Sequence, residues 1–81
     1  MTDDEARQVI EASIGEVAPD ADVGVLELDD DLLDELDLDS MDLLTIVQNV
    51  HDRTGVEIAE RDYPKLTTLD GFVGYLVAAT T

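Results

Sequence analysis

The stretch LDLDSMDLL, residues 36–44, marks the point where a long acidic segment ends and the best amphipathic helix of the chain begins. Ser40 lies at this junction, and a serine there can accept hydrogen bonds from the free amides of the first helical turn. We therefore expect Ser40 to be the N-cap of the helix. The position also suits a phosphate, because the amides point outward and the helix dipole is positive at this end. A phosphoester on the Ser40 hydroxyl would be both exposed and stabilised.

The composition indicates one small, strongly acidic domain. The 81 residues suffice for a single core, and 44% of them are apolar, too many for a disordered acidic tail. With 21 acidic and 4 basic residues the net charge is −17. Nucleic acid and anionic membranes are therefore poor partners, whereas basic patches on other proteins are good ones. Solubility alone is the simpler explanation of the charge, but no Lys or Arg occurs between Arg7 and Arg53, so the acids concentrate around Ser40.

The sequence has no cysteine, which excludes disulfides, a thiolate nucleophile and a zinc–thiolate site. No signal segment opens the chain, and no apolar run approaches the length of a membrane span. We expect a soluble, cytoplasmic monomer. Residues 20–24 partly match a calcium loop, but the glycine falls one place early and no glutamate closes the loop. No metal site is predicted, although loose divalent binding by clustered carboxylates stays open.

Hydrophobic periodicity predicts the first and last helices. Thr2 and Glu5 fit a capping box that begins a helix over about residues 3–17. Thr67 or Thr68 caps the last helix, which runs to about residue 79. Its apolar stripe consists of Leu69, Phe72, Val73, Leu76 and Val77.

The second main helix is expected over about residues 40–53, with Gly55 as its C-terminal stop. Met41 and Leu44 fall nearer the surface beside Ser40, where they could contact an arm or a partner. The core stripe is expected to consist of Leu43, Ile46, Val47 and Val50.

The remaining segments are a long connection and a short helix. Residues 18–39 should lie along the bundle with a helical turn near 30–36, acids outward and leucines inward, including Leu28. Residues 59–63 could form one helical turn that ends before Pro64. The predicted fold is one all-α domain over residues 1–81, a four-helix bundle of three main helices and a short third one, with a long loop between helices one and two.

The sequence argues against an enzyme. The single histidine, His51, lies eleven residues after Ser40, about 16 Å along one helix, too far to act as its base. No Gly-x-Ser-x-Gly elbow surrounds the serine, and no glycine-rich phosphate loop is present. We therefore predict no catalytic residue and interpret Ser40 as the substrate of a modification.

The quartet DSMD at residues 39–42, followed by an apolar helix, resembles the attachment motif of acyl carrier proteins, Asp-Ser-Leu or Asp-Ser-Met. Asp37 stands where that family usually has glycine. The resemblance continues through GVEI at residues 55–58 and LTTL at residues 66–69, and it covers roughly residues 26–77.

The resemblance implies that a phosphopantetheinyl transferase, using coenzyme A and Mg²⁺, attaches 4′-phosphopantetheine to Ser40. Asp39 and Met41 flank the serine within the cofactor-binding motif. The thiol of the arm would then hold an acyl group as a thioester, which supplies the reactive sulfur that the chain lacks. A carrier of this kind catalyses nothing itself and presents its cargo to other enzymes.

The resemblance also implies that acyl-loading and acyl-processing enzymes dock their basic patches on the acidic start of the second helix. The outer face departs from the glutamates usual in carriers of bacterial fatty acid synthesis, and an arginine, Arg53, lies on it. We therefore expect a specialised carrier. The candidate partner-recognition residues are Asp37, Asp42, Leu44, Thr45, His51 and Asp52.

Several functions stay open at this point. The carrier could serve fatty acid, polyketide or specialised lipid biosynthesis. A carrier of activated amino acids, such as a D-alanyl or peptidyl carrier, would share the fold and the arm. In a plain acidic interaction module, Ser40 would be only an N-cap.

Overall fold

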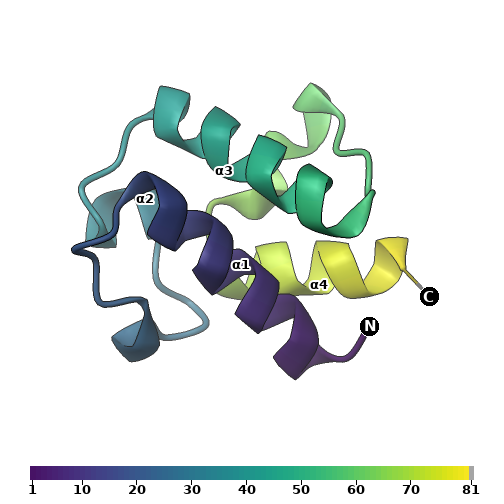
Figure 1. The fold of residues 1–81 in the computed structure, drawn as a ribbon, viewed down its shortest axis with the longest axis horizontal. Helices are drawn as coiled ribbons and strands as arrows, with labels where there is room; N and C mark the ends of the chain where they lie inside the picture. The colour runs from purple at the N-terminus through teal and green to yellow at the C-terminus, as the bar shows by residue number, and fades with distance from the viewer. Residues whose placement is uncertain (81) are drawn as a thin grey trace.

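The computed structural model describes residues 1–80, and their arrangement is that of a small helical bundle (Figure 1). The two longest helices, α1 (Asp3–Val17) and α3 (Ser40–Thr54), run in roughly opposite directions, and α1 packs against both α3 and α4 (Leu69–Ala79). The all-α fold with three main helices is confirmed, and the long connection contains short helices of its own. In chain order the elements are α1 (Asp3–Val17), η1 (Val23–Val25), α2 (Leu32–Glu35), α3 (Ser40–Thr54), η2 (Glu60–Leu66) and α4 (Leu69–Ala79), where η denotes a 3₁₀ helix.

The predicted capping box starts α1. The backbone N–H of Glu5 donates to Thr2 Oγ1 over 3.1 Å, and the N–H of Thr2 donates to Glu5 Oε1 over 2.9 Å. From α1, Ala6, Ile10 and Ile14 are fully buried, four residues apart on one face. This face closes the core formed with α3 and α4.

The predicted core stripes of α3 and α4 are largely confirmed. All four α3 residues are buried, as are Leu69, Phe72, Val73 and Leu76 of α4. Val77 is only partly buried at the edge of this core. Thr68, not Thr67, caps α4, because its Oγ1 accepts the N–H of Gly71 over 3.0 Å.

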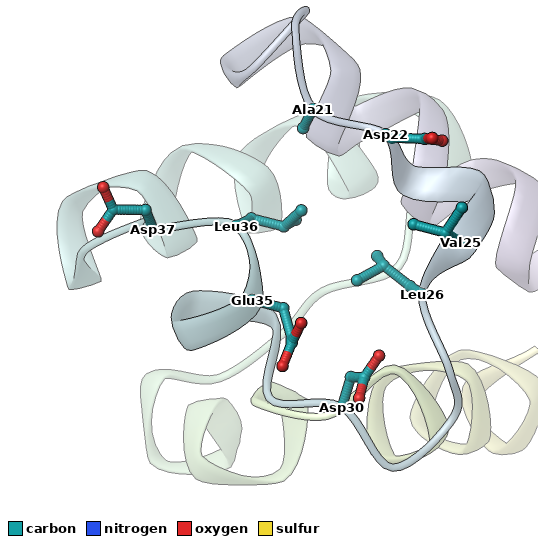
Figure 2. A pocket seen from close by; sticks show the side chains of 8 residues that line it. All are labelled: Ala21, Asp22, Val25, Leu26, Asp30, Glu35, Leu36 and Asp37. Atoms are coloured by element: carbon teal, nitrogen blue, oxygen red, sulfur yellow. The ribbon is translucent and has the colours of Figure 1, made fainter.

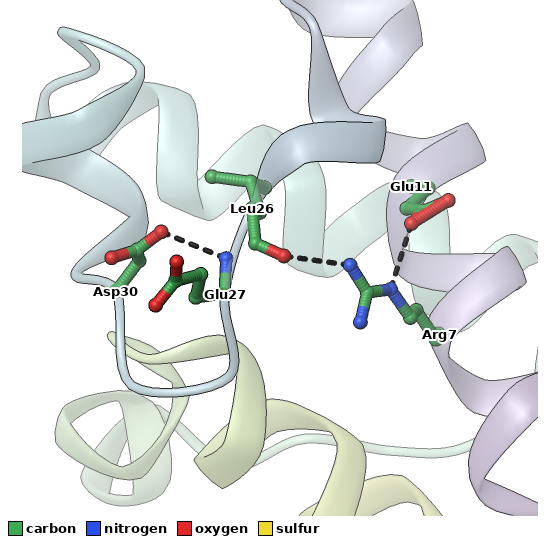
Figure 3. A network of polar contacts seen from close by, with 5 residues as sticks. All are labelled: Arg7, Glu11, Leu26, Glu27 and Asp30. Atoms are coloured by element: carbon green, nitrogen blue, oxygen red, sulfur yellow. Dashed lines mark hydrogen bonds and ion pairs between the residues drawn. The ribbon is translucent and has the colours of Figure 1, made fainter.

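The connection between α1 and α3 is tied to the bundle by hydrogen bonds to its backbone groups. The Arg7 guanidinium of α1 donates to the carbonyl of Leu26 over 2.7 Å and pairs with Glu11 at 2.9 Å (Figure 3). On the other side, the N–H of Leu32 donates to Thr67 O over 2.7 Å. The long segment is therefore held at both α1 and the start of α4.

Two sequence predictions are wrong in detail. Leu28 was expected to face inward, but its side chain is 50% exposed. Its carbonyl accepts the N–H of Asp70 over 2.8 Å, so the backbone rather than the side chain faces the bundle there. The short helix was expected to end before Pro64, but η2 continues to Leu66. A 3₁₀ helix accepts the φ angle of proline and loses only one hydrogen bond to it.

The turn between α2 and α3 is a Schellman motif, which delivers the chain to the start of α3. The N–H of Leu38 donates to Leu33 O over 2.8 Å, and the N–H of Asp37 donates to Asp34 O over 3.4 Å. Asp37 occupies the left-handed position of the motif, with φ of 53°. Glycine usually fills this position because a side chain is strained there.

Replacing Asp37 should therefore reveal this strain. Asp37→Gly is expected to raise the free energy of unfolding by about 0.5–1 kcal/mol. The substitution relieves about 1–2 kcal/mol of strain at the left-handed position, which exceeds the entropic cost of glycine's greater freedom in the unfolded chain. Asp34→Gly removes the same charge inside α2 and should lower stability by about 0.5 kcal/mol. Urea unfolding measures both. Equal effects from the two variants would show that charge, and not backbone strain, decides the stability at Asp37.

A second contact that holds the bundle together joins η2 to α4. The Tyr75 hydroxyl donates to Asp62 Oδ2 over 2.9 Å, and Lys65 Nζ lies 3.2 Å from Asp62 Oδ1. The hydrogen bond from Tyr75, followed by that from Lys65, lowers the pKa of the Asp62 carboxyl. The same bond to Asp62 is the main cause that raises the pKa of the Tyr75 hydroxyl. The pair is thus strongest when the carboxyl is ionised and the phenol is neutral.

We expect Tyr75→Phe to lower the melting temperature at pH 7 more than Tyr63→Phe, whose hydroxyl has no partner among residues 1–80. The lowered pKa means that the Asp62 contribution is present above the ordinary carboxyl value of 3.8 and is lost as the pH falls through the lower folded pKa. The raised Tyr75 pKa means that its contribution is fully present below the ordinary value of 10.0 and is lost as the pH rises from there through the higher folded pKa. Calorimetry at pH 3, 7 and 10.5 checks this. A difference between the two variants that does not shrink at both extremes would contradict the assignment.

Candidate functional site

The start of α3 is capped by Asp39, and the prediction that Ser40 is the N-cap is wrong by one residue. Asp39 Oδ1 accepts the N–H of Asp42 over 2.9 Å, while Asp42 Oδ2 accepts the N–H of Asp39 over 3.2 Å. Two carboxylates three residues apart thus form a complete capping box. Aspartate and serine cap helices about equally well, so the reciprocal bond from Asp42 selects Asp39. A cap at Ser40 would have Leu43 at the third helical position, and leucine cannot return the hydrogen bond.

Ser40 is consequently the first residue inside the helix, and its hydroxyl is free. Its side chain is exposed, and its Oγ has no hydrogen-bond partner among residues 1–80. The backbone N–H groups of Ser40 and Met41 also lack partners within this range, because the capping box satisfies only the N–H of Asp42 in the first turn. A hydroxyl beside two free amides at the positive end of a helix dipole fits a phosphoester.

The surface next to Ser40 is apolar as well as acidic. Met41 is 70% exposed and Leu44 is 49% exposed, so both large side chains face solvent as expected. Thr45, one turn after Met41, donates its hydroxyl to the Met41 carbonyl over 3.2 Å. An apolar strip, formed by Met41 and Leu44, therefore follows Ser40 along the outer face of α3.

The other predicted recognition residues separate into two groups. Asp37 and Asp42 lie within a few residues of Ser40, Asp37 exposed and Asp42 half-buried in the capping box. Asp52 is exposed near the far end of α3, where its Oδ1 accepts the amide of Gln48 over 3.3 Å. The structure therefore gathers the first group around Ser40 and not the second.

His51 belongs to the structure of the helix end. Its Nδ1 lies 2.9 Å from the carbonyl of Val56, which can only accept, so Nδ1 carries the proton. The carbonyl of His51 also accepts the N–H of Gly55, whose φ of 75° ends α3 as predicted. This half-buried histidine stands about three turns from Ser40 and cannot reach it.

Among residues 1–80 the structure gathers three carboxylates that the sequence analysis did not name as a cluster. The carboxylates of Glu27, Asp29 and Asp30 lie within 4.8 Å of one another on the loop before α2. The partial calcium motif at residues 20–24 contributes nothing to it, since part of that stretch forms η1. Exposed carboxylates commonly cluster in this way without an ion, so no metal function follows.

None of the helices within residues 1–80 is long and apolar enough to cross a membrane.

Comparison with known proteins places this geometry in a family. Residues 7–76 match the family model described as the phosphopantetheine attachment site. The acyl carrier protein of Tropheryma whipplei strain Twist is 32% identical over 77 residues, which cover 91% of this chain and 94% of that protein. The acyl carrier protein of Renibacterium salmoninarum is 36% identical over 63 residues, covering 78% and 73% of the two chains. The chain belongs to the acyl carrier protein family, with 4′-phosphopantetheine as its cofactor.

Proposed function

We propose that this protein holds acyl intermediates as thioesters on a 4′-phosphopantetheine arm attached to Ser40, for fatty acid, polyketide or specialised lipid biosynthesis. The observation that carries the proposal is the free, exposed Ser40 hydroxyl at the start of α3, inside the segment that matches the attachment-site family. Within that segment, Ser40 also stands in the Asp-Ser-Met sequence typical of the attachment motif.

The residues around Ser40 have separate roles in this proposal. Asp39 and Asp42 keep the first turn of α3 closed, so that the hydroxyl is presented at a fixed place. The amides of Ser40 and Met41 stabilise the phosphate of the arm. When bound, the arm supplies a thiol, which the cysteine-free chain lacks, and the tether raises the effective concentration of the cargo at each enzyme. The chain itself is a substrate of the transferase and of the acyl-processing enzymes, and not a catalyst.

The structure weakens the interaction-module alternative. That alternative explained the serine as a helix cap, but Asp39 performs the capping. An aminoacyl carrier would use the same serine and arm, so its cargo distinguishes it. Loading of the holo protein by an adenylating enzyme with an amino acid, and not by an acyl-transferring enzyme, would favour the aminoacyl carrier.

The proposed partners are a phosphopantetheinyl transferase and acyl-handling enzymes with basic docking patches. The exposed acids near Ser40 are complementary to a basic patch, and the apolar strip of Met41 and Leu44 offers a hydrophobic contact beside it. A cytoplasmic location and a monomeric state stay predictions from the sequence.

The test is an intact-mass measurement after incubation with coenzyme A, Mg²⁺ and a broad-specificity phosphopantetheinyl transferase. The parent should gain one phosphopantetheine, and Ser40→Ala should gain none while its stability stays within about 0.5 kcal/mol of the parent, because the hydroxyl makes no hydrogen bond.

The matched variant is Asp39→Ala, which removes the cap and keeps the hydroxyl. It should lose about 1 kcal/mol of stability and still gain the arm under conditions in which it remains folded. A mass gain on Ser40→Ala, or a parent that stays unmodified with this transferase and with the transferase of its own source, would refute the attachment site.

A further inference from the structure

A second feature lies at the same end of the molecule as Ser40. The connection between α1 and α3 curls around a cavity of about 330 Å³, bounded by residues 21–26 on one side and by α2 and the turn after it on the other (Figure 2). Leu26 and Leu36 extend into it from opposite sides. Leu26 is buried at 5% exposure, whereas Val25 on the rim is 70% exposed. The cavity thus has an apolar floor and an open mouth.

The charged side chains around the cavity are all carboxylates, namely Asp22, Asp30, Glu35 and Asp37. In Figure 2 Asp30 and Glu35 lie on the same side of the opening, whereas the Asp37 carboxylate points away from it. Glu35 has no side-chain partner among residues 1–80, and Asp30 accepts only the N–H of Glu27 over 2.8 Å. Two carboxylates on one edge therefore retain free acceptor positions.

No cation of the bundle neutralises this edge within residues 1–80. The Arg7 guanidinium, which reaches the loop from α1, donates to the Leu26 carbonyl and to Glu11 (Figure 3). It does not line the cavity. An apolar floor beside two uncompensated carboxylates is complementary to a side chain with an aliphatic stem and a cationic head.

We infer that this cavity is a socket for one arginine side chain of the enzyme that docks on Ser40. The stem would lie between Leu26 and Leu36, and the head group would meet Asp30 and Glu35. Arginine fits better than lysine, because the planar guanidinium offers five donors that can serve two carboxylates together and is more weakly hydrated than an ammonium. A metal ion would gain nothing from the apolar floor.

The inference rests on the proposed function, because an enzyme acting at Ser40 brings its surface to this end of the chain. The turn that contains Asp37 both lines the cavity and leads directly into α3. The phosphopantetheinyl transferase is the partner that must reach the serine hydroxyl itself. We therefore take it as the probe.

The first experiment compares two charge reversals on the same short helix. Glu35→Lys and Asp34→Lys change the net charge equally, but only Glu35 lines the cavity. With the apo protein as substrate and coenzyme A saturating, Glu35→Lys should raise KM about tenfold with kcat unchanged. Asp34→Lys should raise KM about twofold, the part due to long-range attraction. Equal increases would overturn the socket in favour of general electrostatic attraction.

The second experiment fills the socket without changing charge. Val25→Trp places a large side chain on the exposed rim and should raise KM about fivefold, while Leu28→Trp, at another exposed position of the loop, should leave KM unchanged. Circular dichroism of each variant verifies the fold. No effect of Val25→Trp would overturn the inference, and so would an effect of Val25→Trp without one of Glu35→Lys, since the occupant would then be apolar.

The occupant is identified by replacing single surface arginines of the transferase with glutamate. One such variant should restore low KM specifically for the Glu35→Lys carrier, and failure of every arginine to do so would overturn the assignment to arginine. All of these outcomes are changes in the KM of the transferase for a carrier that does accept the arm. A parent that accepts no arm at all instead refutes the proposed function.

Discussion

The reciprocal hydrogen bonds between Asp39 and Asp42 are the constraint on which the site depends. They cap the first turn of α3 without using the serine, so the Ser40 hydroxyl makes no hydrogen bond to the helix. A serine that capped the helix would have its oxygen directed at the backbone, where a hydrogen bond from an N–H group would make it a poorer nucleophile toward a group being transferred. Because Asp39 caps the helix instead, the Ser40 hydroxyl can point to solvent while the first turn of α3 keeps its hydrogen bonds.

Charge is the second constraint, since a net charge of −17 opposes compaction. Three of the four basic residues are used internally, in the pairs Arg7–Glu11, Arg53–Glu16 and Lys65–Asp62. Arg53 thus ties α3 to α1 at 2.6 Å from Glu16, and Arg7 additionally holds the loop at Leu26. Among residues 1–80 no ion pair includes Asp37, Asp39 or Asp42, so the acids around Ser40 remain available to a basic partner.

The main helices and their buried faces could be predicted from the sequence, because hydrophobic periodicity and capping residues act locally. The one-residue error at Ser40 has a physical cause: aspartate and serine cap about equally well, so residue preference alone could not choose between adjacent candidates. The spacing of Asp39 and Asp42 was the signal that could have decided it. The exposure of Leu28 and the cavity beside Leu36 were beyond local reasoning. Both depend on hydrogen bonds between segments far apart in the chain, such as the one from Asp70 to the Leu28 carbonyl.

A free hydroxyl has a consequence for how the carrier changes between its unmodified and modified forms. The proposed esterification of Ser40 would break no hydrogen bond of the bundle within residues 1–80 and would place its phosphate beside the two free amides of the first turn. The attraction of the helix dipole for the phosphate opposes the repulsion from Asp39 and Asp42, so the two effects partly cancel. The fold can therefore remain the same in both forms, and under the proposed function the enzymes that act after the transferase would meet the same surface of α3 whatever the arm carries.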